Sequence, residues 1–143
     1  MKGVFIMLVR NCAGGVVFFR DKVLLLKNEK GEWILPKGVM RNGDLSNEVA
    51  LKRVEEEAGV SAEIVSTAGR TSYEFFSVTR QRPVCNKITW FIMKSPEEKF
   101  KIKENEKFIA GGFYNIDVAM GLVTYSQDRS LLSLSYQKYK ELA

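Results

Sequence analysis

The sequence predicts an α/β fold in which a mixed central β-sheet lies between layers of helices. Runs rich in β-branched and aromatic residues, which are typical of strands, occur both before and after residues 46–58. Residues 46–58 have the apolar spacing of a helix, and a second helical segment follows residue 126. Strands on both sides of a central helix, followed by a last helix, indicate a sheet covered on both faces.

The strands are expected in five segments. Residues 16–19 and 23–26 are joined by a short polar turn, which predicts a tight hairpin. Residues 62–65, continuing toward residues 75–76, and residues 88–93 predict two more strands. A charged connection over residues 96–107 then leads to a strand over residues 108–116, which is apolar despite two glycines.

The central helix is predicted from Ser46 to Ala58, because Val49, Ala50 and Val54 recur at helical spacing among charged residues. Gly59 stands where a C-terminal cap belongs. The last helix is expected to begin near residues 126–128. No repeat or linker divides the chain, so we expect one domain over residues 1–143.

Composition excludes several kinds of chemistry. The chain has 143 residues and no histidine, so it contains no Ser-His-Asp or Cys-His system and no histidine-based zinc protease site. Cys12 and Cys85 are too far apart for a C-x-x-C pair and are expected to be reduced, buried thiols. The first apolar run is shorter than a signal-peptide core, and no segment approaches a membrane span, so a cytoplasmic protein without membrane contact is expected.

The end of the central helix carries an acidic cluster. Residues 53, 56 and 57 are related as i, i+3 and i+4, so Arg53, Glu56 and Glu57 share one helix face. Two carboxylates meeting there form an oxygen site suited to Mg²⁺ or Mn²⁺. The alternative is a solvated helix end whose glutamates pair with Lys52 and Arg53.

The segment from Gly38 to Val60 resembles the Nudix box, G-x5-E-x7-R-E-U-x-E-E-x-G-U, in which U is aliphatic. The residues that match are Gly38, Val54, Glu56, Glu57, Gly59 and Val60. Asp44 stands for the first glutamate and Lys52 for the arginine, and both changes keep the charge. The resemblance implies a Nudix-type α/β/α sandwich and an ion pair between Asp44 and Lys52 that braces the loop against the helix.

The resemblance extends over residues 10–142. The segment 33–38, W-I-L-P-K-G, is similar to the entry common in the Nudix branch that hydrolyses dinucleoside polyphosphates. By resemblance, Glu56, Glu57 and the carbonyl of Gly38 would hold the metal, and one carboxylate would orient or deprotonate water. Lys37 and Lys87 would neutralise phosphates. The candidates for stacking on a nucleobase, among which Tyr73 is assigned to the substrate, are Tyr73, Phe75, Phe76, Trp90 and Tyr125.

One position departs from the family pattern. The glutamate that usually follows the arginine and binds the catalytic magnesium is Arg53 here, and a guanidinium cannot bind a cation. Arg53 either competes with the metal or holds a substrate phosphate bidentately. A glutamate of the loop near residues 103–108, Glu104 or Glu106, would then complete the metal site.

These residues favour a Mg²⁺-dependent hydrolase of nucleotide pyrophosphate links, with dinucleoside polyphosphates as the expected substrates. The alternative is a catalytically impaired Nudix domain that binds or senses nucleotides. The net charge of +5 favours a polyanionic partner. A small nucleotide is expected rather than nucleic acid, because no nucleic-acid-binding signature occurs. The sequence leaves the oligomeric state open, with a homodimer among the alternatives.

Overall fold

The computed structural model describes residues 6–102 and 107–142. Within these residues seven strands form one sheet in the order β3-β2-β1-β6-β5, with β4 paired to β1 and β7 paired to β2. β1 and β6 run parallel, and the other pairs are antiparallel. The strand bounds are β1 Leu8–Phe19, β2 Lys22–Asn28, β3 Trp33–Ile34, β4 Lys37–Val39, β5 Glu63–Ser77, β6 Arg82–Lys94 and β7 Phe108–Asn115.

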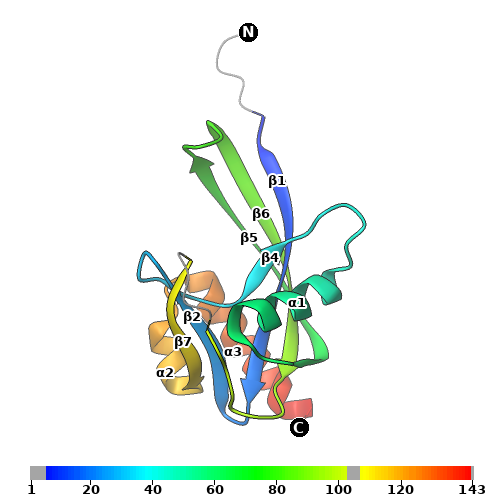
Figure 1. Cartoon of the computed structure of the whole chain (residues 1–143), viewed down its shortest axis with the longest axis vertical. Helices are drawn as coiled ribbons and strands as arrows, with labels where there is room; N and C mark the ends of the chain where they lie inside the picture. Colours follow the sequence, from blue (N-terminus) through cyan, green and yellow to red (C-terminus); the bar gives the residue numbers. More distant parts are fainter. Residues whose placement is uncertain (1–5, 103–106, 143) are drawn as a thin grey trace.

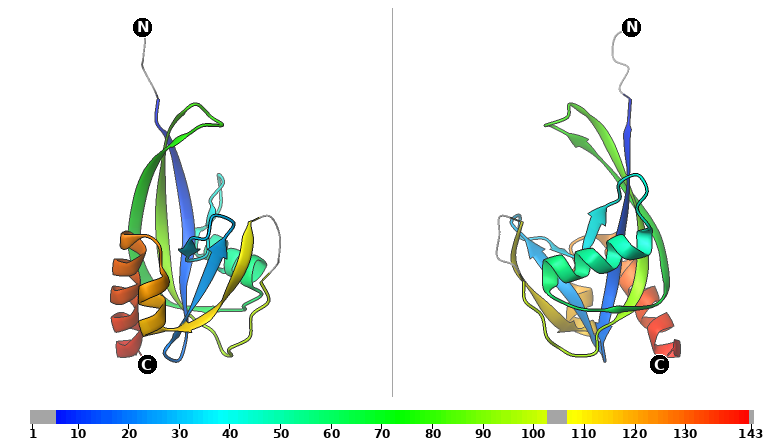
Figure 2. Two further views of the ribbon diagram at one scale, coloured as in Figure 1. Left: turned by 90° about the vertical axis from the view of Figure 1, so that its left-hand side faces the viewer. Right: turned by 45° about the vertical axis from the view of Figure 1, so that its right-hand side comes forward.

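Helices cover both faces of this sheet. They are α1 (Ser46–Ala58), α2 (Ile116–Leu122) and α3 (Ser126–Leu142). The left view of Figure 2 shows α2 and α3 on one side of the sheet and α1 on the other. The predicted α/β/α sandwich with a mixed sheet is therefore confirmed. Within the described residues, no helix is long and apolar enough to cross a membrane.

The central strand β1 contributes side chains to two hydrophobic clusters. Val16 and Phe18 pack in the cluster that includes Leu132 of α3. Val17 packs in the other cluster with Val54 of α1. Successive side chains of a strand point to opposite faces, so an unbroken apolar run is what a strand buried on both faces requires.

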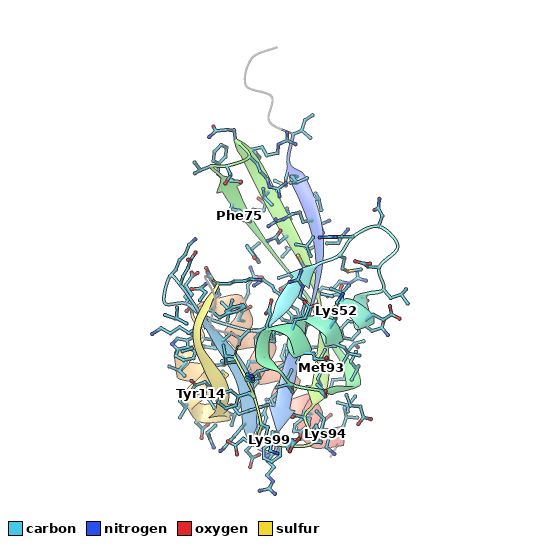
Figure 3. All side chains as sticks on the ribbon, viewed as in Figure 1. Lys52, Phe75, Met93, Lys94, Lys99 and Tyr114 are labelled. Carbon is cyan, nitrogen blue, oxygen red and sulfur yellow. The ribbon has the colours of Figure 1, made fainter. Side chains whose placement is uncertain are left out.

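The first part of β1 and the far ends of β5 and β6 form an arm that extends beyond the helices (Figure 1). Phe75 lies on this arm (Figure 3). Within the arm, Arg10 of β1 pairs in register with Asn86 of β6, and Asn86 pairs with Tyr73 of β5. The sheet therefore brings together three polar side chains that are far apart in sequence.

The hairpin between β1 and β2, helix α1 and its left-handed Gly59 cap confirm the sequence predictions. β1 begins at Leu8, well before the predicted residue 16, because its first half pairs with β6. The strand predicted over residues 108–116 ends at Asn115, whose side chain accepts a hydrogen bond from the Asp117 N–H and begins α2, which was not predicted. Cys12 and Cys85 are both buried and free, as predicted.

Gly14 allows β1, β4 and β6 to pack closely. A Cβ atom at residue 14 would lie 2.5 Å from Trp90 and 2.6 Å from the carbonyl oxygen of Pro36. The next residue, Gly15, donates its N–H to that same carbonyl at 3.1 Å. Because the obstacle is partly backbone, it cannot be relieved by a rotamer change alone.

We expect Gly14→Ala to lower the free energy of unfolding by about 1–3 kcal/mol, the usual cost of overpacking a core. The matched control is Gly121→Ala in α2, where nothing lies within 4 Å of a new Cβ atom. That control should leave stability unchanged or raise it by up to about 1 kcal/mol, because alanine favours helix. Urea unfolding of both variants measures the difference, and equal stabilities would contradict the packing role of Gly14.

Candidate active site

Gly38 of β4 lies directly beneath the side chain of Arg53 from α1. A Cβ atom at residue 38 would overlap the Arg53 side chain, so the guanidinium can lie across β4 only because residue 38 is glycine. β4 itself is fixed by antiparallel pairing of Gly38 with Ala13 of β1. The contact joins the end of α1 to the sheet at the glycine that the box motif identifies.

Glu57, on the next turn of α1, is the buried charge of this site, with a side chain only 7% exposed. Its Oε1 atom lies 3.2 Å from Lys107 Nζ and 4.0 Å from Arg53 Nη1. Its Oε2 atom is buried and has no hydrogen-bond partner among the described residues. Burial raises the pKa of Glu57, against the opposing effect of Lys107 and Arg53.

A cavity of about 200 Å³ opens beside Glu57. Its described lining holds one carboxylate, Glu57, and four cationic side chains, which are Arg10, Lys37, Arg53 and Lys107. A cleft in which cations outnumber carboxylates attracts anions. The cavity is thus suited to phosphate groups.

A larger cavity of about 540 Å³ adjoins it and combines aromatic with polar side chains. The residues that line both cavities are Arg10, Ile34, Lys37, Tyr73 and Asn86. The larger cavity adds aromatic surface from Phe75 and Tyr125 and polar groups from Glu32 and Asp128. Flat aromatic faces with polar groups at the edge are suited to a nucleobase.

Hydrogen bonds and ring contacts order the wall between the two cavities. Arg10 Nε donates to Asn86 Oδ1 at 2.9 Å, and Asn86 Nδ2 donates to Tyr73 Oη at 3.0 Å. Arg10 and Lys37 each lie 5.9 Å from a ring centroid, of Phe75 and Tyr73 respectively. The two rings stack with centroids 6.1 Å apart.

Two of the carboxyl groups that line the larger cavity, Glu32 and Asp128, lie in different environments. Glu32 accepts hydrogen bonds from Tyr125 and Asn28, which lower its pKa, and the contact with Glu32 raises the pKa of Tyr125 to about 12. Asp128, in the first turn of α3, has a pKa raised by burial. The cavity therefore offers one strongly ionised carboxylate and one whose charge is disfavoured.

The structure brings five of the predicted site residues to these cavities, which are Lys37, Gly38, Arg53, Glu57 and Tyr73, and two further stacking candidates, Phe75 and Tyr125, line the larger one. Lys87 lines neither cavity, because it alternates with Asn86 along β6 and faces the other side of the sheet. Glu56 also lines neither cavity. Its side chain is 45% exposed and lies 3.8 Å from Lys52. Glu104 and Glu106 lie outside the described residues.

The predicted ion pair between Asp44 and Lys52 is not formed. Among the described residues, Lys52 pairs with Glu56, one helical turn away. The Asp44 side chain instead accepts a hydrogen bond from the backbone N–H of Arg41 at 2.8 Å, and its own N–H donates to the Arg41 carbonyl at 3.0 Å. Asp44 therefore stabilises a turn within the loop before α1. A short carboxylate bonds more readily to nearby backbone than to a distant lysine.

Sequence reasoning missed Arg10, Asn86, Lys107 and Asp128 as site residues. Arg10 and Asn86 meet through the parallel pairing of β1 with β6, which a local pattern does not reveal. Arg10 and Cys12 are two residues apart, so they lie on one face of a strand. This spacing was the one available signal for Arg10. Lys107, which directly precedes β7, contacts Glu57 across 50 residues of sequence.

The residues present fit a divalent cation that is shared with a phosphate ligand. Mg²⁺ typically takes one or two carboxylates and completes its shell with substrate phosphate and water. Glu57 Oε2 is a buried acceptor with no hydrogen-bond partner in the described residues, so it can serve as a ligand oxygen for such an ion. The described residues contain no group of three acidic, histidine or cysteine side chains around one point.

The pH dependence of stability tests the burial of the Glu57 charge. Because the folded-state pKa lies above its ordinary value of 4.5, the folded protein holds this proton more tightly than the unfolded chain. The contribution of protonated Glu57 to the free energy of unfolding is therefore fully present below about pH 4.5. It is lost as pH rises through the pKa that Glu57 has in the folded state, by at most about 1.4 kcal/mol per pH unit.

We expect Glu57→Gln to remove this dependence, so that its stability relative to wild type rises as pH increases from 4.5 to 7. Urea unfolding at several pH values measures the effect, with Glu55→Gln, an exposed neighbour on α1, as control. Parallel pH profiles for wild type and Glu57→Gln would show that burial does not perturb this carboxyl group.

Comparisons with known proteins agree with the geometry. An RNA pyrophosphohydrolase of Ruthia magnifica subsp. Calyptogena magnifica is 32% identical over 103 residues, which cover 64% of this chain and 58% of that protein. The chain spans between about two and three fifths of the length of the curated relatives it matches.

Solved structures share the fold at low sequence identity. The E. coli dihydroneopterin triphosphate pyrophosphohydrolase matches with a TM-score of 0.71 and 19% identity, covering 88% of this chain and 95% of that one. The C. elegans Ap4A hydrolase matches with a TM-score of 0.67 and 17% identity, covering 92% and 98%. The NUDIX domain family model matches residues 2–132. With its sandwich fold and its glycine-to-glutamate helix motif, the chain belongs to the NUDIX domain family.

Proposed function

We propose that the protein hydrolyses the pyrophosphate link of nucleotides in a reaction that depends on Mg²⁺ or Mn²⁺. The observation that carries this proposal is the pair of adjoining cavities, one aromatic with a polar edge and one rich in cations. A nucleoside with a phosphate chain has the same two-part chemistry. The shared wall formed by Arg10, Lys37 and Tyr73 lets one ligand occupy both cavities.

The nucleobase would lie in the larger cavity. Tyr73 and Phe75 present stacked rings, and a base stacks on such faces with little dependence on its identity. Asp128 offers polar atoms that can pair with the edge of the base. Base preference would thus come from Asp128, and affinity from the rings.

The phosphate chain would lie in the smaller cavity. Lys37 and Arg10 would neutralise phosphates next to the nucleoside, and Arg53 would hold a phosphate nearer the bond that breaks. Glu57 Oε2 would accept a hydrogen bond from the attacking water and orient it toward phosphorus. Glu57, the carbonyl of Gly38 and Glu56 are the residues that would hold the divalent ion. When bound, such an ion acidifies water and stabilises charge on phosphate oxygens.

Dinucleoside polyphosphates are the substrate class that we propose. Support comes from the segment 33–38, which is similar to the entry of the branch that acts on these compounds. In the fold, Trp33 packs edge-on against Tyr114 and beneath Lys27 rather than lining either cavity. Trp33 would fix the position of the segment that leads to Lys37. The Ap4A hydrolase of C. elegans shares this fold.

A nucleotide-binding module without hydrolysis is the second candidate. The observation that favours it is the position of Arg53, which places a cation where the family motif has a metal-binding glutamate. The two candidates differ in turnover, not in binding.

The proposal predicts release of nucleotide products with Mg²⁺ from at least one of three compounds: diadenosine tetraphosphate, a nucleoside triphosphate or a 5′-triphosphorylated RNA. Glu57→Gln should lower kcat by about 100-fold or more, the scale of losing a preorganised charged group. Glu55→Gln, which is exposed, should keep the wild-type rate.

Anion-exchange chromatography of the products measures turnover. Hydrolysis by Glu57→Gln at the wild-type rate would contradict the role of this carboxylate. Binding of nucleotides with no product from any of the three compounds would favour the second candidate.

A further inference from the structure

We infer that the protein binds the polyphosphate of a nucleotide without a divalent cation, because Arg53 and Lys107 supply positive charge from the chain itself. This inference rests on the proposed nucleotide site and deepens it. It separates two steps: the protein's cations bind the ligand, and the metal is needed only for the chemistry.

The smaller cavity carries an excess of positive charge. The described lining of the smaller cavity has four cationic side chains against the single carboxylate of Glu57. An anionic ligand entering this cavity meets a positive excess even when no metal is present. Phosphate oxygens form short, strong hydrogen bonds with guanidinium and ammonium groups. The cavity thus contains its own counter-charge for a pyrophosphate group.

Glu57 holds Arg53 and Lys107 close to one of its oxygens. Arg53 and Lys107 both approach the same oxygen of Glu57, Oε1, at 4.0 and 3.2 Å. At 4.0 Å the Arg53 contact is an ion pair without a hydrogen bond, so its N–H groups are not used by Glu57. Glu57 therefore positions Arg53 by charge and leaves the planar fork of its guanidinium available for a phosphate.

Arg53 and Lys107 are more exposed than the carboxylate that they contact. The Arg53 side chain is 36% exposed and that of Lys107 is 57% exposed, whereas Glu57 is almost completely buried. Gly38 holds Arg53 against β4, so the guanidinium is kept at the cavity rather than free in solvent. A ligand can reach both cations while Glu57 stays beneath them. Glu57 Oε2 remains for the water or metal of the later step.

The test is calorimetry with a nonhydrolysable analogue, adenosine 5′-(β,γ-imido)triphosphate, titrated into the full chain in EDTA and then in Mg²⁺. We expect the two dissociation constants to agree within about threefold, since the charge-assisted contacts come from the protein. Metal-free binding that is more than about 100-fold weaker, equivalent to about 2.7 kcal/mol, would overturn the inference.

Charge-removing variants locate the contacts. Arg53→Gln and Lys107→Gln should each weaken metal-free binding about tenfold or more, the scale of one charge-assisted hydrogen bond. The matched control is Lys99→Gln, which removes the same charge and a surface ion pair with Glu97. Figure 3 shows Lys99 at the end of the molecule opposite Phe75. Wild-type affinity in both site variants would overturn the inference.

A second variant keeps the inference testable if Arg53→Gln does not fold. Arg53→Lys keeps the charge but loses the planar fork, so its metal-free affinity should lie between those of wild type and Arg53→Gln. If Arg53→Gln does not fold, Arg53→Lys and Lys107→Gln decide the question, and wild-type affinity in both overturns it. Hydrolysis in Mg²⁺ is measured separately. Turnover without metal-free binding refutes this inference alone, whereas metal-free binding without turnover refutes only the proposed function.

Discussion

The buried carboxylate of Glu57 sets the character of the whole site. Taking a charge out of water is costly unless cations accompany it, and Lys107 and Arg53 provide them on one oxygen. The cations therefore gather at the end of α1, and the second oxygen is left without a described partner. The proposed phosphate affinity and the proposed acceptor for catalysis both rest on this one arrangement.

The sheet supports that arrangement from below. Gly14 lets β4 lie close against β1, and Gly38 then lets Arg53 cross β4 toward Glu57. Parallel pairing of β1 with β6 adds Arg10 and Asn86 to the wall of the same cavities. Gly14 and Gly38 allow the backbones to lie close together, and only close backbones allow the long cationic side chains above them to converge.

The local parts of this design could be predicted from the sequence, and the non-local parts could not. Helix α1 has its predicted bounds because its apolar spacing and the Gly59 cap are local signals. The predicted ion pair between Asp44 and Lys52 was wrong because the loop backbone competes with Lys52 for the short Asp44 carboxylate. Lys87 lines neither cavity because strand parity, which decides its face, depends on the pairing of β6, and its contact with phosphate stays a prediction. Glu106 lies outside the described residues, so its role stays a prediction.

The most direct measurement of the central claim is the ¹⁵N NMR signal of the side-chain nitrogens of Arg53 and Lys107 during titration with the imido nucleotide in EDTA. We expect both signals to shift on binding, because each nitrogen gains a hydrogen bond to a phosphate oxygen, while the Lys99 signal stays in place. Nucleotide binding that leaves the signals of Arg53 and Lys107 unchanged would contradict it.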